Sequence, residues 1–122
     1  MHPELEAQVV MNKEQQKIVA VLLTHNRKEL LKKGLKGLFS QTYPLEKIII
    51  VDSVSTDGTY EMLLDKGIID RPDIRYIRLK ENKGPSGGFA EAIKYAQEED
   101  PSWVWVLDDD IIPKEDCLET LL

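Results

Sequence analysis

The chain has 122 residues, of which 42% are hydrophobic and 31% charged, and this composition is typical of a globular domain. A chain of this length buries a sizeable core without a disulfide or a metal ion to hold it together. The net charge of −6 argues against a protein whose main partner is nucleic acid, and no apolar run approaches the roughly 18 residues of a membrane-spanning helix.

The cysteine content and the first residues indicate the compartment. Cys117 is the single cysteine, so no intramolecular disulfide can form and a reducing environment is expected. Glu4 and Glu6 stand where a signal peptide would carry basic residues and an apolar stretch. We therefore expect a cytoplasmic protein without a transmembrane segment.

The chain changes character at Ile18. Residues 1–17 are mostly polar, and we expect an arm that is loosely ordered or packs on a neighbour. Residues 18–23 are a continuous β-branched and aliphatic run, which is typical of a strand buried on both faces of a parallel sheet. An α/β domain is therefore predicted over residues 18–122.

Strands and helices alternate from this point onward. In chain order we predict a helix around the leucines at 30, 31, 35 and 38, a strand at 47–51, a helix to about Leu64, a strand at 74–79, a helix at 89–98, a strand at 103–107 and a helix from Pro113 to Leu122. The strand at 74–79 alternates apolar residues with Arg75 and Arg78, so we expect it near an edge of the sheet. The glycine-rich segment 80–88 is predicted to be a loop.

This order of elements predicts an α/β fold: a mostly parallel, Rossmann-like sheet of about four strands with flanking helices. Ligands bind at the carboxyl ends of the strands in such open sheets. Polar groups stand at those ends, namely Thr24-His25-Asn26-Arg27, Asp52-Ser53, Glu81-Asn82 and Asp108-Asp109-Asp110.

The three consecutive aspartates suggest a metal site. In an extended segment Asp108 and Asp110 point the same way while Asp109 points elsewhere. Two carboxylates that close repel each other unless a cation offsets their charge, and all-oxygen ligation suits Mg²⁺ or Mn²⁺. With so few protein ligands the ion completes its shell with water and phosphate, so a diphosphate-bearing substrate is expected.

Other interpretations of the triplet carry less weight. An acidic segment could simply cap a helix that begins near Pro113. An EF-hand loop counted from Asp108 is excluded, because Ile112 and Pro113 occupy the positions that need an oxygen ligand and a glycine. A nucleophilic aspartate of the phosphatase type usually follows the first strand, whereas this triplet follows the last.

Three further candidates leave alternatives open. The segment Gly84-Pro85-Ser86-Gly87-Gly88 could cradle an anion at a helix N-terminus, or could be a turn that lets a helix pack close to the sheet. Asp52 could accept a hydrogen bond from a base or sugar, or cap a helix. His25 could be a ligand or a base, but a single histidine in a polar loop more often has neither role.

Together these pieces resemble the nucleotide-sugar-binding half of the family 2 glycosyltransferases with the GT-A fold, over about Lys17 to Leu122. The resemblance rests on their order and spacing: Val21-Leu22-Leu23-Thr24-His25-Asn26-Arg27, Ser40-Gln41-Thr42-Tyr43-Pro44, Ile50-Val51-Asp52-Ser53-Val54-Ser55-Thr56-Asp57-Gly58-Thr59, Asn82-Lys83-Gly84 and Asp108-Asp109-Asp110. The Gly-Gly-Phe that follows Asn82-Lys83-Gly84 resembles the galactofuranosyl- and rhamnosyltransferase branch.

The resemblance implies roles for the residues at the strand ends. Thr24, Asn26 and Arg27 would line the nucleotide site, with Arg27 near the base or the diphosphate. Asp52 would hydrogen-bond the pyrimidine. The Asn82–Gly88 segment, which includes Gly87 and Gly88, would lie along the donor.

The resemblance also implies roles for the triplet. Asp108 and Asp109 would sit near the ribose and the donor sugar, and Asp110, with Asp108, would hold Mg²⁺ or Mn²⁺ on the diphosphate. Ser53 departs from the family, which commonly has Asn or Asp at that position.

No residue of the chain is predicted to be the catalytic base. Members that invert at the anomeric carbon use a carboxylate located after the triplet, but only twelve residues follow Asp110. The carboxylates among them, Glu115, Asp116 and Glu119, are interpreted as solvated helix face. We therefore expect a chain truncated before its acceptor-binding half, with Leu118, Leu121 and Leu122 exposed and available for self-association.

The prediction is thus the donor-binding domain of a metal-dependent glycosyltransferase. It would transfer a sugar from a UDP- or dTDP-sugar to a glycan acceptor in cell-surface polysaccharide synthesis, in the cytoplasm or peripherally at the inner face of the membrane. One alternative is a non-catalytic nucleotide-binding module. Another is a nucleotidyltransferase or phosphohydrolase, which would favour a basic glycine-rich loop where this chain has Thr24 to Arg27.

Overall fold

Four parallel strands form one sheet in the computed structural model, which describes residues 16–122. The strands are β1 (Ile18–Thr24), β2 (Lys47–Asp52), β3 (Ile74–Arg78) and β4 (Trp103–Asp108). Their order is β3-β2-β1-β4, so the two most apolar strands are central and the predicted edge position of the third strand is confirmed.

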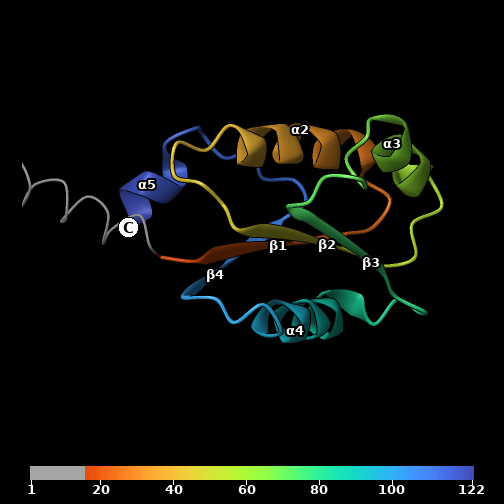
Figure 1. Ribbon diagram of the computed structural model, residues 1–122. Coiled ribbons are helices and arrows are strands. Elements are labelled where there is room, and N and C mark those ends of the chain that lie inside the picture. Colours follow the sequence, from red (N-terminus) through yellow and green to blue (C-terminus); the bar gives the residue numbers. More distant parts are fainter. Residues whose placement is uncertain (1–15) are drawn as a thin grey trace, which may run out of the picture.

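Helices cover both faces of the sheet (Figure 1). The helices α2 (Lys28–Phe39) and α3 (Thr59–Asp65) lie on one face, and α4 (Gly84–Gln97) lies on the other. The short helix α5 (Cys117–Leu121) lies beside the amino-terminal edge of the sheet. This arrangement confirms the predicted α/β fold.

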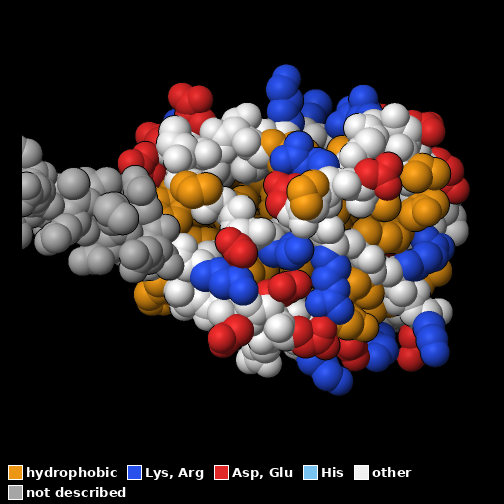
Figure 2. Space-filling model, in the orientation of Figure 1, with side chains coloured by type: hydrophobic (Ala, Val, Ile, Leu, Met, Phe, Trp, Pro, Cys, Tyr) orange, Lys and Arg blue, Asp and Glu red, His pale blue; other side chains and the backbone are white. Residues whose placement is uncertain are grey.

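The core has two halves because the side chains of β1 alternate between the faces. Ala20 and Leu22 pack with the buried leucines of α2 and with Leu63 of α3. Val19 and Val21 pack with the alanines of α4 instead. The opposite side of α2 is polar, and Figure 2 shows Lys and Arg side chains projecting along the edge of the molecule over this helix.

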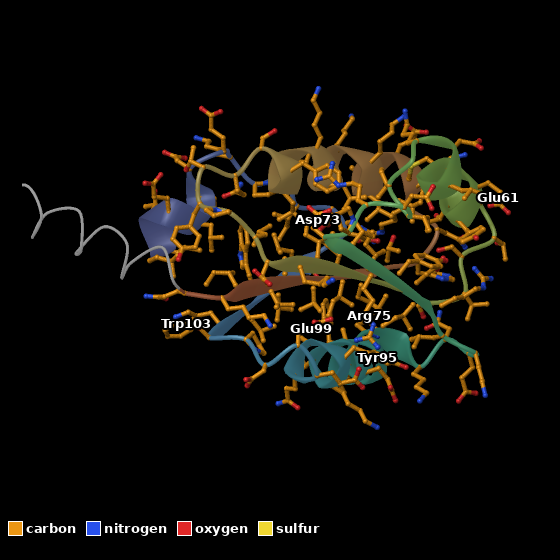
Figure 3. All side chains as sticks on the ribbon, in the orientation of Figure 1. Glu61, Asp73, Arg75, Tyr95, Glu99 and Trp103 are labelled. Carbon is orange, nitrogen blue, oxygen red and sulfur yellow. The ribbon has the colours of Figure 1, made fainter. Side chains whose placement is uncertain are left out.

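A polar contact joins the edge strand β3 to α4. The Arg75 guanidinium lies 5.2 Å from the centre of the Tyr95 ring and 3.0 Å from the Glu98 carboxylate. Glu99 lies 3.8 Å from Arg75, and Figure 3 shows Arg75, Tyr95 and Glu99 grouped between β3 and α4. This contact explains why a charged residue, Arg75, interrupts the apolar residues of β3: its side chain packs against charged and aromatic groups at the end of α4.

The structure corrects the prediction of a glycine-rich loop over residues 80–88. Helix α4 begins at Gly84, with Pro85 in its first turn, where the fixed φ of proline favours a helix. Gly88 lies inside the helix against β1, because a Cβ there would stand 2.7 Å from both terminal methyl carbons of Leu23. Glycine here permits close packing of a helix on the sheet, although the segment is the first part of that helix and not the turn before it.

The structure also corrects the last predicted helix. The only helix after β4 in the described residues is α5, which begins at Cys117 rather than near Pro113. The preceding segment is held against α2, where a Cβ on Gly37 would meet the Pro113 carbonyl oxygen at 2.7 Å. The Gln41 amide donates to the Lys114 carbonyl and accepts from the Leu118 N–H.

Leu118 is buried against Ile18 and Tyr43, contrary to the expected exposure. Leu121 and Leu122 are exposed, as expected. Self-association through this helix stays a prediction.

Most of the predicted N-terminal arm lies outside the described residues. Of its last residues, Gln16 accepts a hydrogen bond from the indole of Trp103, and the Lys17 carbonyl accepts from the Ser102 N–H. The division at residue 17 stays a prediction. Across residues 16–122, no helix has the length and apolar character needed to cross a membrane.

Candidate functional site

A pocket of about 380 Å³ opens at the carboxyl-terminal edge of the sheet. It lies over the ends of β1 and β4, with the start of α4 along one side. Its lining residues are Leu23, Thr24, His25, Arg27, Ser53, Asn82, Gly84, Pro85, Phe89, Asp108, Asp109 and Asp110. The parallel register explains this grouping, because Leu23 of β1 is paired with Asp108 of β4.

Asp109 points into the protein. Its side chain is only 11% exposed, and one carboxylate oxygen accepts hydrogen bonds from the Thr24 hydroxyl at 3.1 Å and the His25 N–H at 3.4 Å. The other oxygen lies 3.7 Å from the Arg27 guanidinium. Asp109 therefore ties the end of β1 to the end of β4.

Asp108 and Asp110 are exposed, although β4 ends at Asp108 and a turn closed by the hydrogen bond from the Ile111 N–H to the Asp108 carbonyl replaces the extended segment that the sequence predicted. The Asp110 carboxylate lies 3.4 Å from the Arg27 guanidinium, and both side chains are half exposed. Among residues 16–122, no side chain donates to or pairs with the Asp108 carboxylate. Two accessible carboxylates and one guanidinium thus face the same pocket.

The donor set fits a Mg²⁺ or Mn²⁺ ion that takes part of its coordination from a ligand. Carboxylate oxygens are hard donors, and both ions prefer them. In the described part of the chain, no group of three His, Cys, Asp or Glu side chains could hold a metal by itself. A metal here would therefore need oxygens from water and from phosphate, besides those of Asp108 and Asp110.

Asn26 supports the site from outside the pocket. It adopts a left-handed conformation with φ of 52°, which Asn tolerates better than most residues. Its N–H donates to the Ser55 hydroxyl at 2.9 Å, and its side-chain oxygen accepts from the Thr56 N–H at 2.7 Å. Asn26 thereby joins the loop after β1 to the loop after β2.

Asp52 is fully buried and does not line the pocket. One carboxylate oxygen accepts from the Ser55 N–H at 2.8 Å, and the other accepts from the Tyr76 hydroxyl at 2.5 Å and lies 3.4 Å from Arg78. Burial, followed by the hydrogen bond to the Asp52 carboxylate, raises the pKa of Tyr76. Asp52 is therefore part of a hydrogen-bond network that joins the ends of β2 and β3.

The Asn82–Gly88 segment contributes unequally to the pocket. Asn82 and Gly84 line it, and the Asn82 side-chain oxygen accepts a hydrogen bond from the Gly84 N–H at 2.9 Å. Gly87 and Gly88 do not line it. Gly88 instead faces Leu23, as described above. A donor-binding role for these two glycines stays a prediction.

Sequence reasoning gave little weight to two aromatic residues that line the pocket, His25 and Phe89. The ring nitrogen Nδ1 of His25 is hydrogen-bonded to the Ser53 carbonyl at 2.5 Å, which orients the ring beside the ends of β1 and β2. The signal for His25 was its place directly after a buried strand. The signal for Phe89 was the Gly-Gly-Phe of the family resemblance, which gave this residue no role in the site.

Comparison with known proteins identifies the family. The model of the family described as Glycosyl transferase family 2 matches residues 19–122. The chain is 31% identical over 106 residues to galactofuranosyltransferase GlfT1 of Mycolicibacterium smegmatis. This alignment covers 86% of this chain and 34% of that protein. It is 30% identical over 97 residues to poly-beta-1,6-N-acetyl-D-glucosamine synthase of Staphylococcus epidermidis, covering 80% of this chain and 22% of that protein.

Solved structures share the fold. TarS of S. aureus (residues 1–349, in complex with UDP-GlcNAc) superposes with a TM-score of 0.73 at 24% identity, covering 86% of this chain and 30% of that one. The mannosyltransferase PcManGT from Pyrobaculum calidifontis, in complex with GDP-Man and Mn²⁺, superposes with a TM-score of 0.60 at 25% identity, covering 78% and 28%. The chain spans about a third of the length of the first curated relative. It belongs to glycosyl transferase family 2.

Proposed function

We propose that this chain is the donor-binding part of a metal-dependent glycosyltransferase. The donor would be a UDP- or dTDP-sugar, and the sugar would pass to a glycan acceptor in the synthesis of a cell-surface polysaccharide. The single cysteine is free, which is consistent with the cytoplasmic location expected from the sequence, and association with the inner face of the membrane is part of the same proposal.

One observation carries the proposal: a guanidinium and two accessible carboxylates face the same pocket. Arg27 offers the planar cation that suits a diphosphate, and Asp108 and Asp110 offer oxygens for a divalent ion. A nucleoside diphosphate with its metal ion carries a negative charge that the guanidinium complements and a positive charge that the two carboxylates complement. A binding site for a neutral sugar alone would need neither the guanidinium nor the pair of carboxylates.

Relatives and structural neighbours support the choice of ligand. TarS has been solved with UDP and with UDP-GlcNAc, and PcManGT with GDP-Man and Mn²⁺. The poly-beta-1,6-N-acetyl-D-glucosamine synthase and the teichuronic acid glycosyltransferase TuaG of Bacillus subtilis have names that point to polysaccharide synthesis, and GlfT1 is named a galactofuranosyltransferase. These names support a glycan acceptor but do not specify the sugar.

The residues around the pocket would divide the work of donor binding. Arg27 would bind the diphosphate, and Asp109, held by the Thr24 hydroxyl and the His25 N–H, would accept hydrogen bonds from the ribose or the donor sugar. Asn82 would contact the donor from the start of α4. Asp108 and Asp110 would hold Mg²⁺ or Mn²⁺, which when bound neutralises the charge that develops on the leaving nucleoside diphosphate.

The base-recognition role of Asp52 requires a change from the conformation described. Its two oxygens already receive the Ser55 N–H, the Tyr76 hydroxyl and Arg78. A pyrimidine N–H would have to displace one of these partners, of which Arg78 is the most exposed, with 43% of its side chain accessible. Asn26 would act indirectly, because it fixes the loops on either side of the nucleotide.

We assign no general base to this chain. Glu119 accepts a hydrogen bond from Thr42 beside the amino-terminal edge of the sheet, opposite the pocket. Leu118, next to it, packs on Ile18 at the start of β1. The carboxylates near α5 are therefore too far from the strand ends to act on an acceptor there.

Two measurements on the 122-residue chain separate an enzyme from a binding module. The first is binding of UDP, dTDP, GDP and ADP by calorimetry in the presence of Mn²⁺, where we expect the pyrimidine nucleotides to bind more tightly. The second is hydrolysis of the matching nucleotide sugar, with Asp110→Asn as the test variant and Asp70→Asn, an exposed loop residue, as the control. Hydrolysis lost only in Asp110→Asn supports an enzyme. Binding without turnover would leave a nucleotide-binding module, and no binding of any nucleotide would refute the proposal.

A further inference from the structure

Arg27 occupies the position from which a cation would neutralise the acidic triplet. Its guanidinium lies 3.7 Å from Asp109 and 3.4 Å from Asp110. Among the described residues it is the only basic side chain within ion-pair distance of the triplet. Arg27 therefore supplies the positive charge nearest to these carboxylates.

The two carboxylates hold Arg27 differently. Asp109 is nearly buried and also receives the Thr24 hydroxyl and the His25 N–H, so it keeps its place when Arg27 leaves. Asp110 is half exposed and has Arg27 as its one side-chain partner among residues 16–122. The link between Arg27 and Asp110 can therefore break without disturbing the core.

We propose that Arg27 acts as an electrostatic gate on the metal site: it pairs with Asp110 in the nucleotide-free chain and opposes metal binding until the donor diphosphate draws it away. This inference rests on the proposed function and adds a binding order to it. Arg27 and a divalent ion on Asp110 would repel each other at close range, whereas a diphosphate placed between them attracts both.

The gate predicts a change in metal affinity that is not expected if Arg27 only binds the diphosphate. If Arg27 only bound the diphosphate, its loss would weaken nucleotide binding and leave the metal affinity of the nucleotide-free chain unchanged. If Arg27 also opposes the metal, its loss strengthens metal binding to the nucleotide-free chain. Because coupling between two ligands is reciprocal, the factor by which Mn²⁺ strengthens UDP binding then shrinks as well, provided that Arg27 on the diphosphate leaves the Mn²⁺ affinity of the UDP-bound chain unchanged.

The test is Mn²⁺ binding to the nucleotide-free, 122-residue chain, measured by electron paramagnetic resonance of free Mn²⁺ at low ionic strength. The variant is Arg27→Met, and the matched control is Lys28→Met. The control removes the same charge from the next residue, whose ammonium lies near Gly58 rather than near the triplet. We expect Arg27→Met to bind Mn²⁺ about tenfold more tightly than wild type and Lys28→Met to differ less than about twofold.

A double-mutant cycle identifies the carboxylate through which the gate acts. In an Asp110→Asn background, Arg27→Met should change the Mn²⁺ affinity less than about twofold, because the residue that Arg27 blocks is no longer a carboxylate. A tenfold effect that persists in this background would overturn the gate. Equal Mn²⁺ affinity in wild type and Arg27→Met would also overturn it, as would undetectable Mn²⁺ binding in Arg27→Met.

Failure of the gate and failure of the proposed function give different results. If wild type binds UDP more tightly with Mn²⁺ but Arg27→Met leaves the nucleotide-free Mn²⁺ affinity unchanged, only the gate fails. If wild type binds UDP equally well with and without Mn²⁺, the metal-dependent function itself fails.

Discussion

The hydroxyl of Thr24 donates a hydrogen bond to the Asp109 carboxylate across 3.1 Å, and so joins the last residue of β1 to the residue that follows β4. The bond is buried, and the Thr24 side chain has no access to water as an alternative partner. It fixes the middle aspartate pointing inward, while Asp108 at the end of β4 and Asp110 in the turn that follows are exposed and line the pocket.

Thr24→Val tests this link. Valine keeps the shape of threonine but removes a donor from the nearly buried Asp109 carboxylate, which should lower the free energy of unfolding by about 1–3 kcal/mol. Urea denaturation measures it. Thr120→Val, whose hydroxyl bonds to its own exposed helix, is the control and should cost less than about 1 kcal/mol. Equal stability of Thr24→Val and wild type would contradict the role of this bond.

Gly88→Ala tests the close approach of α4 to the sheet. The added methyl group would stand 2.7 Å from the terminal carbons of Leu23, and relieving this overlap should cost about 1–3 kcal/mol of stability. Leu23→Ala removes those carbons, so Gly88→Ala should cost less in that background. If the two substitutions were additive in urea denaturation, the proposed contact would be wrong.

Tyr76→Phe tests the network that holds Asp52. Loss of a hydrogen bond to a charged group should reduce the free energy of unfolding by about 2 kcal/mol at pH 7. Tyr60→Phe, at an exposed tyrosine on α3, is the control and should change it by less than about 0.5 kcal/mol.

The same variant should change how stability depends on pH. Burial and then the bond to Asp52 raise the pKa of Tyr76, so above about pH 10 the unfolded chain loses this proton while the folded chain keeps it. The contribution of Tyr76 is therefore fully present below pH 10 and is lost as the pH rises toward its folded pKa. Urea denaturation between pH 8 and 11 should show a smaller decline for Tyr76→Phe. Parallel profiles would contradict the raised pKa.

Gln41→Ala tests how the segment after β4 is held. The substitution leaves the Leu118 N–H and the Lys114 carbonyl without their side-chain partner, which should make the last residues easier to unfold locally. Hydrogen exchange at residues 114–122 should accelerate at least tenfold, while exchange in β1 changes little. Acceleration spread equally over the whole chain would indicate a global loss of stability instead.

The fold was largely predictable because its two central strands are apolar on both sides, as helices on both faces of a sheet require. Errors came where a local pattern had two physical causes. Gly88 suggested a loop, yet it lies inside α4, where a Cβ would stand 2.7 Å from the terminal carbons of Leu23. Pro113 suggested a helix start, but its segment is held irregular by contacts with Gly37 and Gln41, which are distant in sequence.

The candidate site shows the same division. Arg27 and the triplet could be placed together from the sequence, because strands of a parallel sheet end at one edge. The burial of Asp52 could not be predicted from the sequence, since it depends on Tyr76 and Arg78. These residues belong to β3, which pairs with β2 only in the folded chain. Phe89 was noted in the Gly-Gly-Phe motif, but its place in the pocket could not be predicted, because it follows from where α4 begins.

The most direct test of the account is calorimetric titration of UDP into the chain with and without Mn²⁺, for wild type, Asp110→Asn and the control Asp70→Asn. We predict that Mn²⁺ strengthens UDP binding at least tenfold in wild type and in Asp70→Asn, and that Asp110→Asn abolishes this gain. Metal-independent binding in wild type, or an undiminished effect of Mn²⁺ in Asp110→Asn, would contradict a metal–diphosphate site at the acidic triplet.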